Sequence, residues 1–181
     1  TMGADFMDYI VADKVIIPED YQQYYSEKVL YLPDVYLPND DKREVANTNT
    51  SRSDFGLPED GFVFCCFNTS YKISPAEFDV WMRILGQVEG SVLWLSSSNK
   101  WAVENLKKEA EKRGISADRI IFASRLDKNS EHLARHKHAD LFIDTFNYNA
   151  HTTAAGDALM TGFPLVTKQG EQFAARVASS P

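Results

Sequence analysis

Residues 144–162 read Asp-Thr-Phe-Asn-Tyr-Asn-Ala-His-Thr-Thr-Ala-Ala-Gly-Asp-Ala-Leu-Met-Thr-Gly, and this stretch predicts how the chain is arranged. The apolar run Ala139–Ile143 before it predicts a buried strand, and Thr152–Met160 predicts a helix that a glycine ends. His151 and the two threonines after it fall in the first helical turn. Free backbone N–H groups, two hydroxyls and the positive end of the helix dipole favour an anion there. The simpler alternative is a capped helix with an exposed histidine.

Strand and helix patterns alternate along the rest of the chain. The expected strands are Asp8–Ala12, Lys28–Leu32, Phe62–Phe67, Ser91–Leu95, Arg119–Ala123, Ala139–Ile143 and Leu165–Thr167. The expected helices are Pro75–Val88, Asn99–Arg113, Ser130–His138, Thr152–Met160 and Glu171–Ser180. Short connections between alternating elements predict an α/β fold, a Rossmann-like parallel sheet with helices on both faces. Ligands of such sheets bind beyond the carboxyl ends of the strands.

Composition divides the chain into three parts. Residues 61–181 carry the regular alternation and predict the α/β core, the part of the chain that contains the nucleotide-binding residues discussed below. Residues 38–60 have almost no apolar side chains and predict a polar linker or surface loop, which leaves residues 1–37 as a separate N-terminal segment. Because the chain stops within a predicted helix, we expect it to be a piece of a larger protein.

Charge and cysteine content narrow the possible partners and compartments. The 19 basic and 26 acidic side chains give a net charge of −7 without a basic run, which argues against a nucleic-acid partner. No stretch resembles a membrane span or a signal peptide. Cys65 and Cys66 are adjacent in an apolar run and predict buried free thiols, which suits a reducing, cytoplasmic location. No Cys/His metal spacing occurs.

Three loops carry polar residues that suit a nucleotide. Lys72 precedes a predicted helix start, where a cation is unfavourable unless a phosphate binds; the alternative is a solvated lysine. His132 and Arg135 share one helical face and suit a planar base, or else form the outer face of that helix. Asp157 is an acceptor suited to sugar hydroxyls. Glycine-rich dinucleotide and Walker motifs, a nucleophile elbow and acidic metal clusters are missing, so a nucleotide-sugar site without a protein-held metal is the best interpretation.

Seven short motifs occur in an order that resembles the O-linked N-acetylglucosaminyltransferases, glycosyltransferase family 41, which includes the plant SPINDLY-type O-fucosyltransferases. They are Gly56-Leu57-Pro58-Glu59-Asp60, Cys66-Phe67-Asn68, Tyr71-Lys72-Ile73, Ser91-Val92-Leu93-Trp94-Leu95, Arg119-Ile120-Ile121-Phe122, Asn149-Ala150-His151-Thr152-Thr153 and Gly170-Glu171. The resemblance implies the nucleotide-binding C-terminal lobe of a GT-B glycosyltransferase. The first 37 residues would then join it to an N-terminal catalytic lobe, usually preceded by tetratricopeptide repeats that recognise acceptor proteins. The long insert of the animal enzymes is missing, which suggests a bacterial or minimal form.

The resemblance also implies which residues bind the diphosphate of the donor. Lys72 is similar to the family's catalytic lysine on the diphosphate, and Thr152 and Thr153 are similar to threonines on the same phosphates. His151 is similar to a histidine beside the nucleotide. Thr69 stands where the family often has glutamine, so that phosphate contact is weaker or replaced.

Five further residues would contact the rest of the donor. His132 and Arg135 resemble the residues beside the uracil, and Leu126 would offer backbone atoms to the base. Asp157 resembles the aspartate on the ribose hydroxyls, although the stretch between His151 and Gly162 has one residue more than in the animal enzymes, which leaves the register of Asp157 open. Gly3 resembles a backbone contact near the donor sugar.

These residues together imply an inverting transfer of GlcNAc from UDP-GlcNAc to Ser/Thr of proteins, without cofactor or metal. The alternatives are a protein O-fucosyltransferase that uses GDP-fucose and a sensor that binds a nucleotide sugar without turnover. The chain contains no convincing general base, so by itself it would be inactive.

Overall fold

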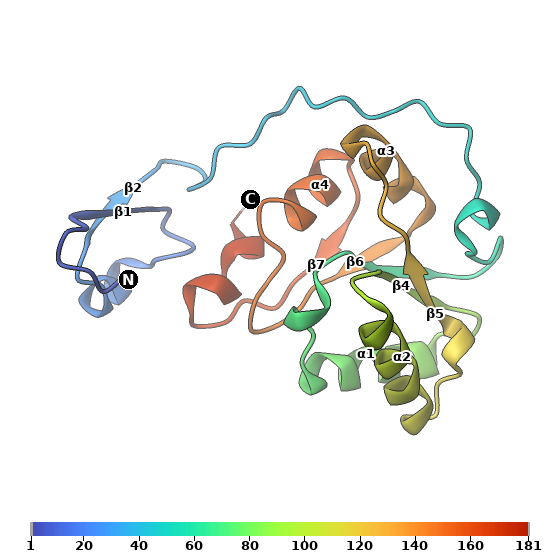
Figure 1. The fold of residues 1–181 in the computed structure, drawn as a ribbon. Coiled ribbons are helices and arrows are strands. Elements are labelled where there is room, and N and C mark those ends of the chain that lie inside the picture. Colours follow the sequence, from blue (N-terminus) through green and yellow to red (C-terminus); the bar gives the residue numbers. More distant parts are fainter. Residues whose placement is uncertain (1, 181) are drawn as a thin grey trace.

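The computed structural model describes residues 2–180 and contains a five-stranded sheet and a two-stranded sheet (Figure 1). The larger sheet has the strand order β5-β4-β3-β6-β7, and every pair of neighbours is parallel. Its strands are β3 Val63–Cys66, β4 Val92–Ser96, β5 Ile120–Ala123, β6 Leu141–Ile143 and β7 Leu165–Val166. The predicted parallel α/β architecture is confirmed.

Four α-helices cover the two faces of this sheet: α1 Pro75–Gln87, α2 Lys100–Lys112, α3 Asn129–Ala134 and α4 Ala154–Met160. Figure 1 shows α1 and α2 on one side of the sheet and α3 and α4 on the other. Ser74 and Glu77 form the predicted capping box at α1, and the Asn99 side chain caps α2 by accepting from the Ala102 N–H at 2.9 Å. The chain therefore changes face between β3 and β6, and the carboxyl end of that strand pair is the position where such folds bind ligands.

The predicted helix Glu171–Ser180 is wrong. The chain forms two short 3-10 turns there, Phe173–Ala175 and Val177–Ser179, and Arg176 between them has non-helical dihedral angles, φ −125° and ψ −11°. The Arg176 side chain donates to the Val15 carbonyl at 2.7 Å and to the Gly170 carbonyl at 2.8 Å. These bonds hold Arg176 against Gly170, at the start of the same segment, and against Val15 of the N-terminal unit. A continuous helix over this segment would not bring these groups together.

Two other predicted helices are shorter than expected. The segment predicted as Ser130–His138 is α3 followed by a 3-10 turn, Arg135–His138, and the segment predicted to start at Thr152 becomes α-helical only at Ala154. Further 3-10 turns are Glu19–Tyr24, Ser53–Phe55, Ser70–Lys72 and Ala117–Arg119. In the part of the chain that the structure describes, no helix is long and apolar enough to cross a membrane.

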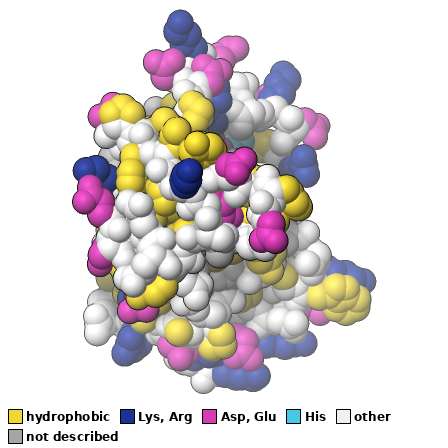
Figure 2. Space-filling model, turned by 90° about the vertical axis from the view of Figure 1, so that its left-hand side faces the viewer, with side chains coloured by type: hydrophobic (Ala, Val, Ile, Leu, Met, Phe, Trp, Pro, Cys, Tyr) yellow, Lys and Arg dark blue, Asp and Glu magenta, His cyan; other side chains and the backbone are white. Residues whose placement is uncertain are grey.

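The N-terminal segment forms its own small unit around β1 Tyr9–Ala12 and β2 Lys28–Tyr31, which pair in parallel. Asp13 connects it to the C-terminal turns: Oδ2 accepts from the Ser180 hydroxyl at 2.6 Å. Phe6 is 84% exposed. Figure 2 views this end of the molecule and shows apolar side chains between interspersed acidic and basic ones.

Residues 38–52 form an extended segment, which we call the strap. It crosses from the N-terminal unit over α4 and α3 and reaches the far edge of the sheet (Figure 1). The Ala46 N–H donates to the Ser130 carbonyl at 3.0 Å, and Arg52 pairs with Asp140 at 2.8 Å. The strap is polar, as its composition predicts, but its backbone and side chains are hydrogen-bonded to the core.

Candidate functional site

The loops after β3 and β6 meet at the carboxyl end of the sheet and enclose a cleft of about 290 Å³. It is lined by Phe67, Asn68, Thr69, Tyr71, Lys72, His132, His151, Thr153 and Ala154. Five of the ten predicted donor-binding residues belong to this set: Thr69, Lys72, His132, His151 and Thr153. The cleft thus brings together side chains from the loops after β3 and β6 and from helix α3, which are far apart in the sequence.

A buried carboxylate, Asp144, fixes the shape of these loops. Its Oδ1 accepts from the Asn68 side chain at 2.9 Å and from the Thr145 and Ala150 N–H groups at 2.8 and 2.7 Å. Its Oδ2 accepts from the Thr167 hydroxyl at 2.7 Å. Burial raises the pKa of Asp144, although all four hydrogen bonds favour the charged form. Sequence reasoning missed this role; the available signal was an aspartate directly after an apolar strand.

Lys72 lies at the edge of the cleft with neutral partners. Its Nζ donates to the Asn149 carbonyl at 2.9 Å and lies 3.9 Å from the centre of the Tyr148 ring. Partial burial lowers the pKa of Lys72. No carboxylate among residues 2–180 lies within ion-pair distance of this ammonium group. A cation with only a carbonyl and a ring as partners is well suited to an anionic ligand.

The start of α4 supplies one hydroxyl to the cleft. Thr153 lines it, whereas Thr152 lines a smaller cavity beside Tyr36. The structure therefore separates the two threonines that the sequence predicted on the same phosphates. Their backbone N–H groups have no acceptor within the described residues. Because α4 has only seven residues, its dipole contributes less than the sequence suggested.

His151 is positioned by its neighbours on both sides. Its Nε2 lies 3.2 Å from the Ala174 carbonyl, and its ring lies 4.6 Å from that of Tyr148, centre to centre. Since a carbonyl only accepts, this nitrogen carries the hydrogen. Burial lowers the pKa of His151, which favours a neutral ring beside the ammonium group of Lys72.

The opposite wall of the cleft contains His132, whose ring packs 5.5 Å from that of Phe67. Arg135 lies behind it, 4% exposed, and donates to the Ser124 carbonyl at 2.8 Å with its guanidinium over Phe67. Leu126 is half-buried on the loop after β5. Neither Arg135 nor Leu126 lines the cleft.

Asp157 lies behind His132 and is fully buried. Its Oδ1 accepts from Nη1 of Arg43 at 2.5 Å, and its Oδ2 lies 3.4 Å from Nε2 of His132. Burial opposes the charged carboxylate, but His132 and Arg43 outweigh it and lower the pKa of Asp157. Both oxygens thus face protein groups rather than the cleft. Gly3, with φ +65°, belongs to the N-terminal unit and does not line the cleft.

A parallel sheet with a cation and hydroxyls in a cleft at its switch point has the position and the chemistry suited to an anionic ligand. Comparison with known proteins identifies the family. The sequence profile of glycosyl transferase family 41 matches residues 1–47 and 39–181, and the chain belongs to this family. The resemblance found in the motifs is confirmed, and the bacterial origin stays a prediction.

The relatives include enzymes from a plant and an animal. The chain is 40% identical over 99% of its length to the probable UDP-N-acetylglucosamine–peptide N-acetylglucosaminyltransferase SEC of Arabidopsis thaliana, of which it covers 19%. It is 43% identical over 72% of its length to the corresponding enzyme of Caenorhabditis elegans, of which it covers 11%. The chain therefore spans about a fifth or less of the curated relatives that it matches.

A solved structure shares the fold. A lysine-to-methionine mutant of the O-GlcNAc transferase of Thermobaculum terrenum superposes with a TM-score of 0.79 and 30% identity. The match covers 96% of this chain and 32% of that structure. The predicted GT-B lobe is thus confirmed as the fold of this chain.

Proposed function

We propose that the chain is the nucleotide-sugar-binding lobe of an inverting, metal-independent glycosyltransferase that transfers GlcNAc from UDP-GlcNAc to Ser/Thr of proteins. The observation that carries this proposal is the meeting of Lys72, His151, Thr153 and His132 in one cleft at the switch point of the sheet. Relatives named as UDP-N-acetylglucosamine–peptide N-acetylglucosaminyltransferases support the choice of donor and acceptor.

The diphosphate of the donor would lie against the wall that contains Lys72. As the acceptor hydroxyl attacks the anomeric carbon, the bond to the diphosphate breaks and its electron pair leaves with UDP. Lys72 stabilises the charge that develops there, and the Thr153 hydroxyl adds a donor. The backbone N–H of Thr153, which has no acceptor among the described residues, would be a further donor for the diphosphate.

The proton of the acceptor hydroxyl would leave through a group outside this chain. His151 donates Nε2–H to a backbone carbonyl, and Asp144 is enclosed by four hydrogen bonds. Neither Nε2 of His151 nor the Asp144 carboxylate is therefore free to accept a proton in the cleft. In this proposal the chain binds the donor and stabilises the leaving group, and the full-length protein supplies the base.

The remaining parts of the chain fit a position between two lobes. We propose that residues 1–37, including Gly3, join this lobe to an N-terminal catalytic lobe. Residues 38–60 are then the polar linker or loop between this N-terminal segment and the α/β core. Acceptor proteins would bind through upstream regions, among them tetratricopeptide repeats. The buried free thiols of Cys65 and Cys66 support a cytoplasmic location.

A second candidate, a protein O-fucosyltransferase that uses GDP-fucose, rests on the base side of the cleft. Arg135 and Leu126, which would select uracil, do not line the cleft, so the identity of the base depends mainly on His132. A SPINDLY relative from Arabidopsis thaliana is 29% identical over 99% of the chain. The third candidate is a sensor that binds a nucleotide sugar without turnover.

The first prediction tests the donor by calorimetric titration of the full-length protein with UDP, GDP and their sugars. We expect UDP to bind more tightly than GDP, because His132, which lines the cleft, resembles a uracil-side residue of the family. A preference for GDP of more than about tenfold, about 1.4 kcal/mol, would replace the GlcNAc assignment with the fucosyl one. Binding of UDP-GlcNAc without transfer to any Ser/Thr peptide would favour the sensor.

A further inference from the structure

Arg43 connects the strap to the base side of the cleft. Its guanidinium forms an ion pair with Asp157, which is 114 residues away in the sequence, and Asp157 in turn lies against His132. Its side chain is 25% exposed, whereas that of Asp157 is fully buried. The strap therefore supplies the cation that neutralises the buried Asp157 carboxylate. Only His132 lies between this carboxylate and the cleft.

The strap is close to α4 where Arg43 crosses it. A Cβ atom placed on Gly156 would lie 3.5 Å from the Asn39 side chain and 4.0 Å from Nη2 of Arg43, at ordinary van der Waals distance. The Arg43 Nε also donates to the Asp40 carbonyl at 3.3 Å, which directs the side chain towards α4. The position of the guanidinium is thus determined by the backbone of the strap as well as by Asp157.

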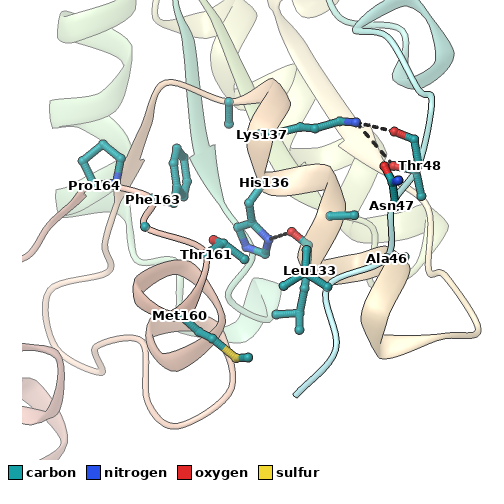
Figure 3. A pocket seen from close by; sticks show the side chains of 14 residues that line it. Ala46, Asn47, Thr48, Leu133, His136, Lys137, Met160, Thr161, Phe163 and Pro164 are labelled. Atoms are coloured by element: carbon teal, nitrogen blue, oxygen red, sulfur yellow. Dashed lines mark hydrogen bonds between the residues drawn. The ribbon is translucent and has the colours of Figure 1, made fainter. Parts of the chain in front are cut away.

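Further along, the strap is tied to α3 and to the turn that follows it. Figure 3 shows Lys137 donating to the Thr48 carbonyl, at 2.7 Å, and His136 bonded to the Leu133 carbonyl. A second cleft, separate from the candidate site and about 560 Å³ in volume, lies between this part of the strap, α3 and the loop after α4. The strap is thus bonded to the core at Arg43, at Ala46 and at Thr48, and the last two of these residues line this cleft.

Two side chains, those of Arg43 and His132, face the two oxygens of the Asp157 carboxylate. Arg43 occupies Oδ1 of Asp157, and Oδ2, which has no hydrogen bond of good geometry, faces Nε2 of His132 at 3.4 Å. A carboxylate beside one ring nitrogen determines the orientation of an imidazole and which nitrogen carries its hydrogen. Without Arg43, Asp157 would keep a buried charge with a weaker partner and would be free to rotate.

We propose that Arg43 is a positioning residue for the nucleotide base: through Asp157, it holds the His132 ring in the orientation that contacts the base. This inference rests on the proposed function of the cleft. Asp157 does not line the cleft, so Arg43 does not compete with a ligand there. The strap would thus couple the lobe-joining part of the chain to base recognition.

The test compares two substitutions, Arg43→Met and Arg43→Lys, in the full-length protein. Calorimetry measures the binding of UDP, uridine and inorganic pyrophosphate. We expect Arg43→Met to weaken uridine and UDP by the same factor, about three- to tenfold, and to leave pyrophosphate binding unchanged. Arg43→Lys restores a charge beside Asp157 and should recover part of the loss. Lys42→Met is the matched control, since Lys42 is the exposed neighbour on the strap.

Three results would overturn the proposal. Unchanged uridine binding would show that Arg43 does not act on the base, tighter binding would show that it obstructs the ligand, and equal losses for uridine and pyrophosphate would show a general effect on the fold. The imidazole NMR signals of His132 provide a readout without ligand, and they should shift in Arg43→Met but not in the control. Failure of the parent protein to bind UDP would refute the proposed function, whereas unmoved His132 signals would refute the inference about Arg43.

Discussion

The two walls of the cleft differ in how their charged groups are satisfied. We call them, after the parts of the donor proposed to bind there, the phosphate wall, with Lys72, His151 and Thr153, and the base wall, with His132 and Asp157 behind it. On the phosphate wall, Lys72 is half-buried with a carbonyl and an aromatic ring as its partners. On the base wall, Asp157 is fully buried and faces both Arg43 and His132. One wall keeps a charge available for a ligand, and the other uses its charges within the protein.

The base wall continues into the core through His136, which is 1% exposed. Its Nδ1 lies 3.1 Å from the carbonyls of His132 and Leu133 and therefore carries the hydrogen, while Nε2 has no partner among the described residues. Burial, with a smaller contribution from His132, lowers the pKa of His136 to about 4. His136 thus links the base wall to the folded core, and its substitution should alter the free energy of unfolding.

The largest expected effect is a loss of stability on acidification that depends on His136. Because its pKa is about 4 in the folded protein and about 6.5 when unfolded, the unfolded chain takes up the proton first. The contribution of neutral His136 to the free energy of unfolding is fully present above pH 6.5. It is lost as the pH falls towards 4, by up to about 3 kcal/mol. Denaturant titrations between pH 7 and 4 should show a flatter profile for His136→Phe.

A matched substitution on the phosphate wall sharpens this difference. Burial also lowers the pKa of His151, but to a smaller extent, so His151→Phe should flatten the same profile less. An equal effect of the two substitutions would mean that the walls do not differ in the way that the structure indicates.

The second effect, on binding, concerns Lys72→Ala. A charge-assisted contact to a diphosphate contributes roughly 1.5–3 kcal/mol, so UDP should bind about ten- to a hundredfold more weakly. Uridine lacks the diphosphate and should bind the variant and the parent alike, and the free energy of unfolding should fall by only about 1 kcal/mol, because one hydrogen bond to the Asn149 carbonyl is lost. Calorimetry and denaturant titration measure these quantities.

Lys128→Ala is the control for this experiment, since Lys128 lies on the loop before α3 with its side chain 74% exposed. Equal losses for uridine and UDP in Lys72→Ala would show that Lys72 supports the base or the fold. Its assignment to the phosphate wall would then be wrong.

The smallest effect is expected from removal of divalent metal. If Lys72 and the Thr153 hydroxyl stabilise the diphosphate, EDTA should leave the affinity for UDP unchanged within about twofold. A titration of the parent protein with and without magnesium measures this. A large loss in EDTA would indicate that a metal ion completes the phosphate wall.

The sequence by itself determined the fold class and much of the phosphate wall. Alternating apolar strands and capped helices specify a parallel α/β sheet because burial on both faces of a strand requires a continuous apolar run. The loops that follow Phe67 and Ile143 then come together, because neighbouring parallel strands end at the same edge. Lys72 and His151 were predicted there from local patterns alone, and both line the cleft.

Only the tertiary structure decided the base wall and the C-terminal segment. Local patterns carry no information about a partner 114 residues away, so the pairing of Arg43 with Asp157 was invisible in the sequence. The same holds for Arg176, whose bonds to Val15 and Gly170 replaced a predicted helix with two short turns. In both cases the long-range bonds of an arginine, and not local propensity, determine the position of the segment, because a buried or half-buried guanidinium must find acceptors wherever the fold provides them.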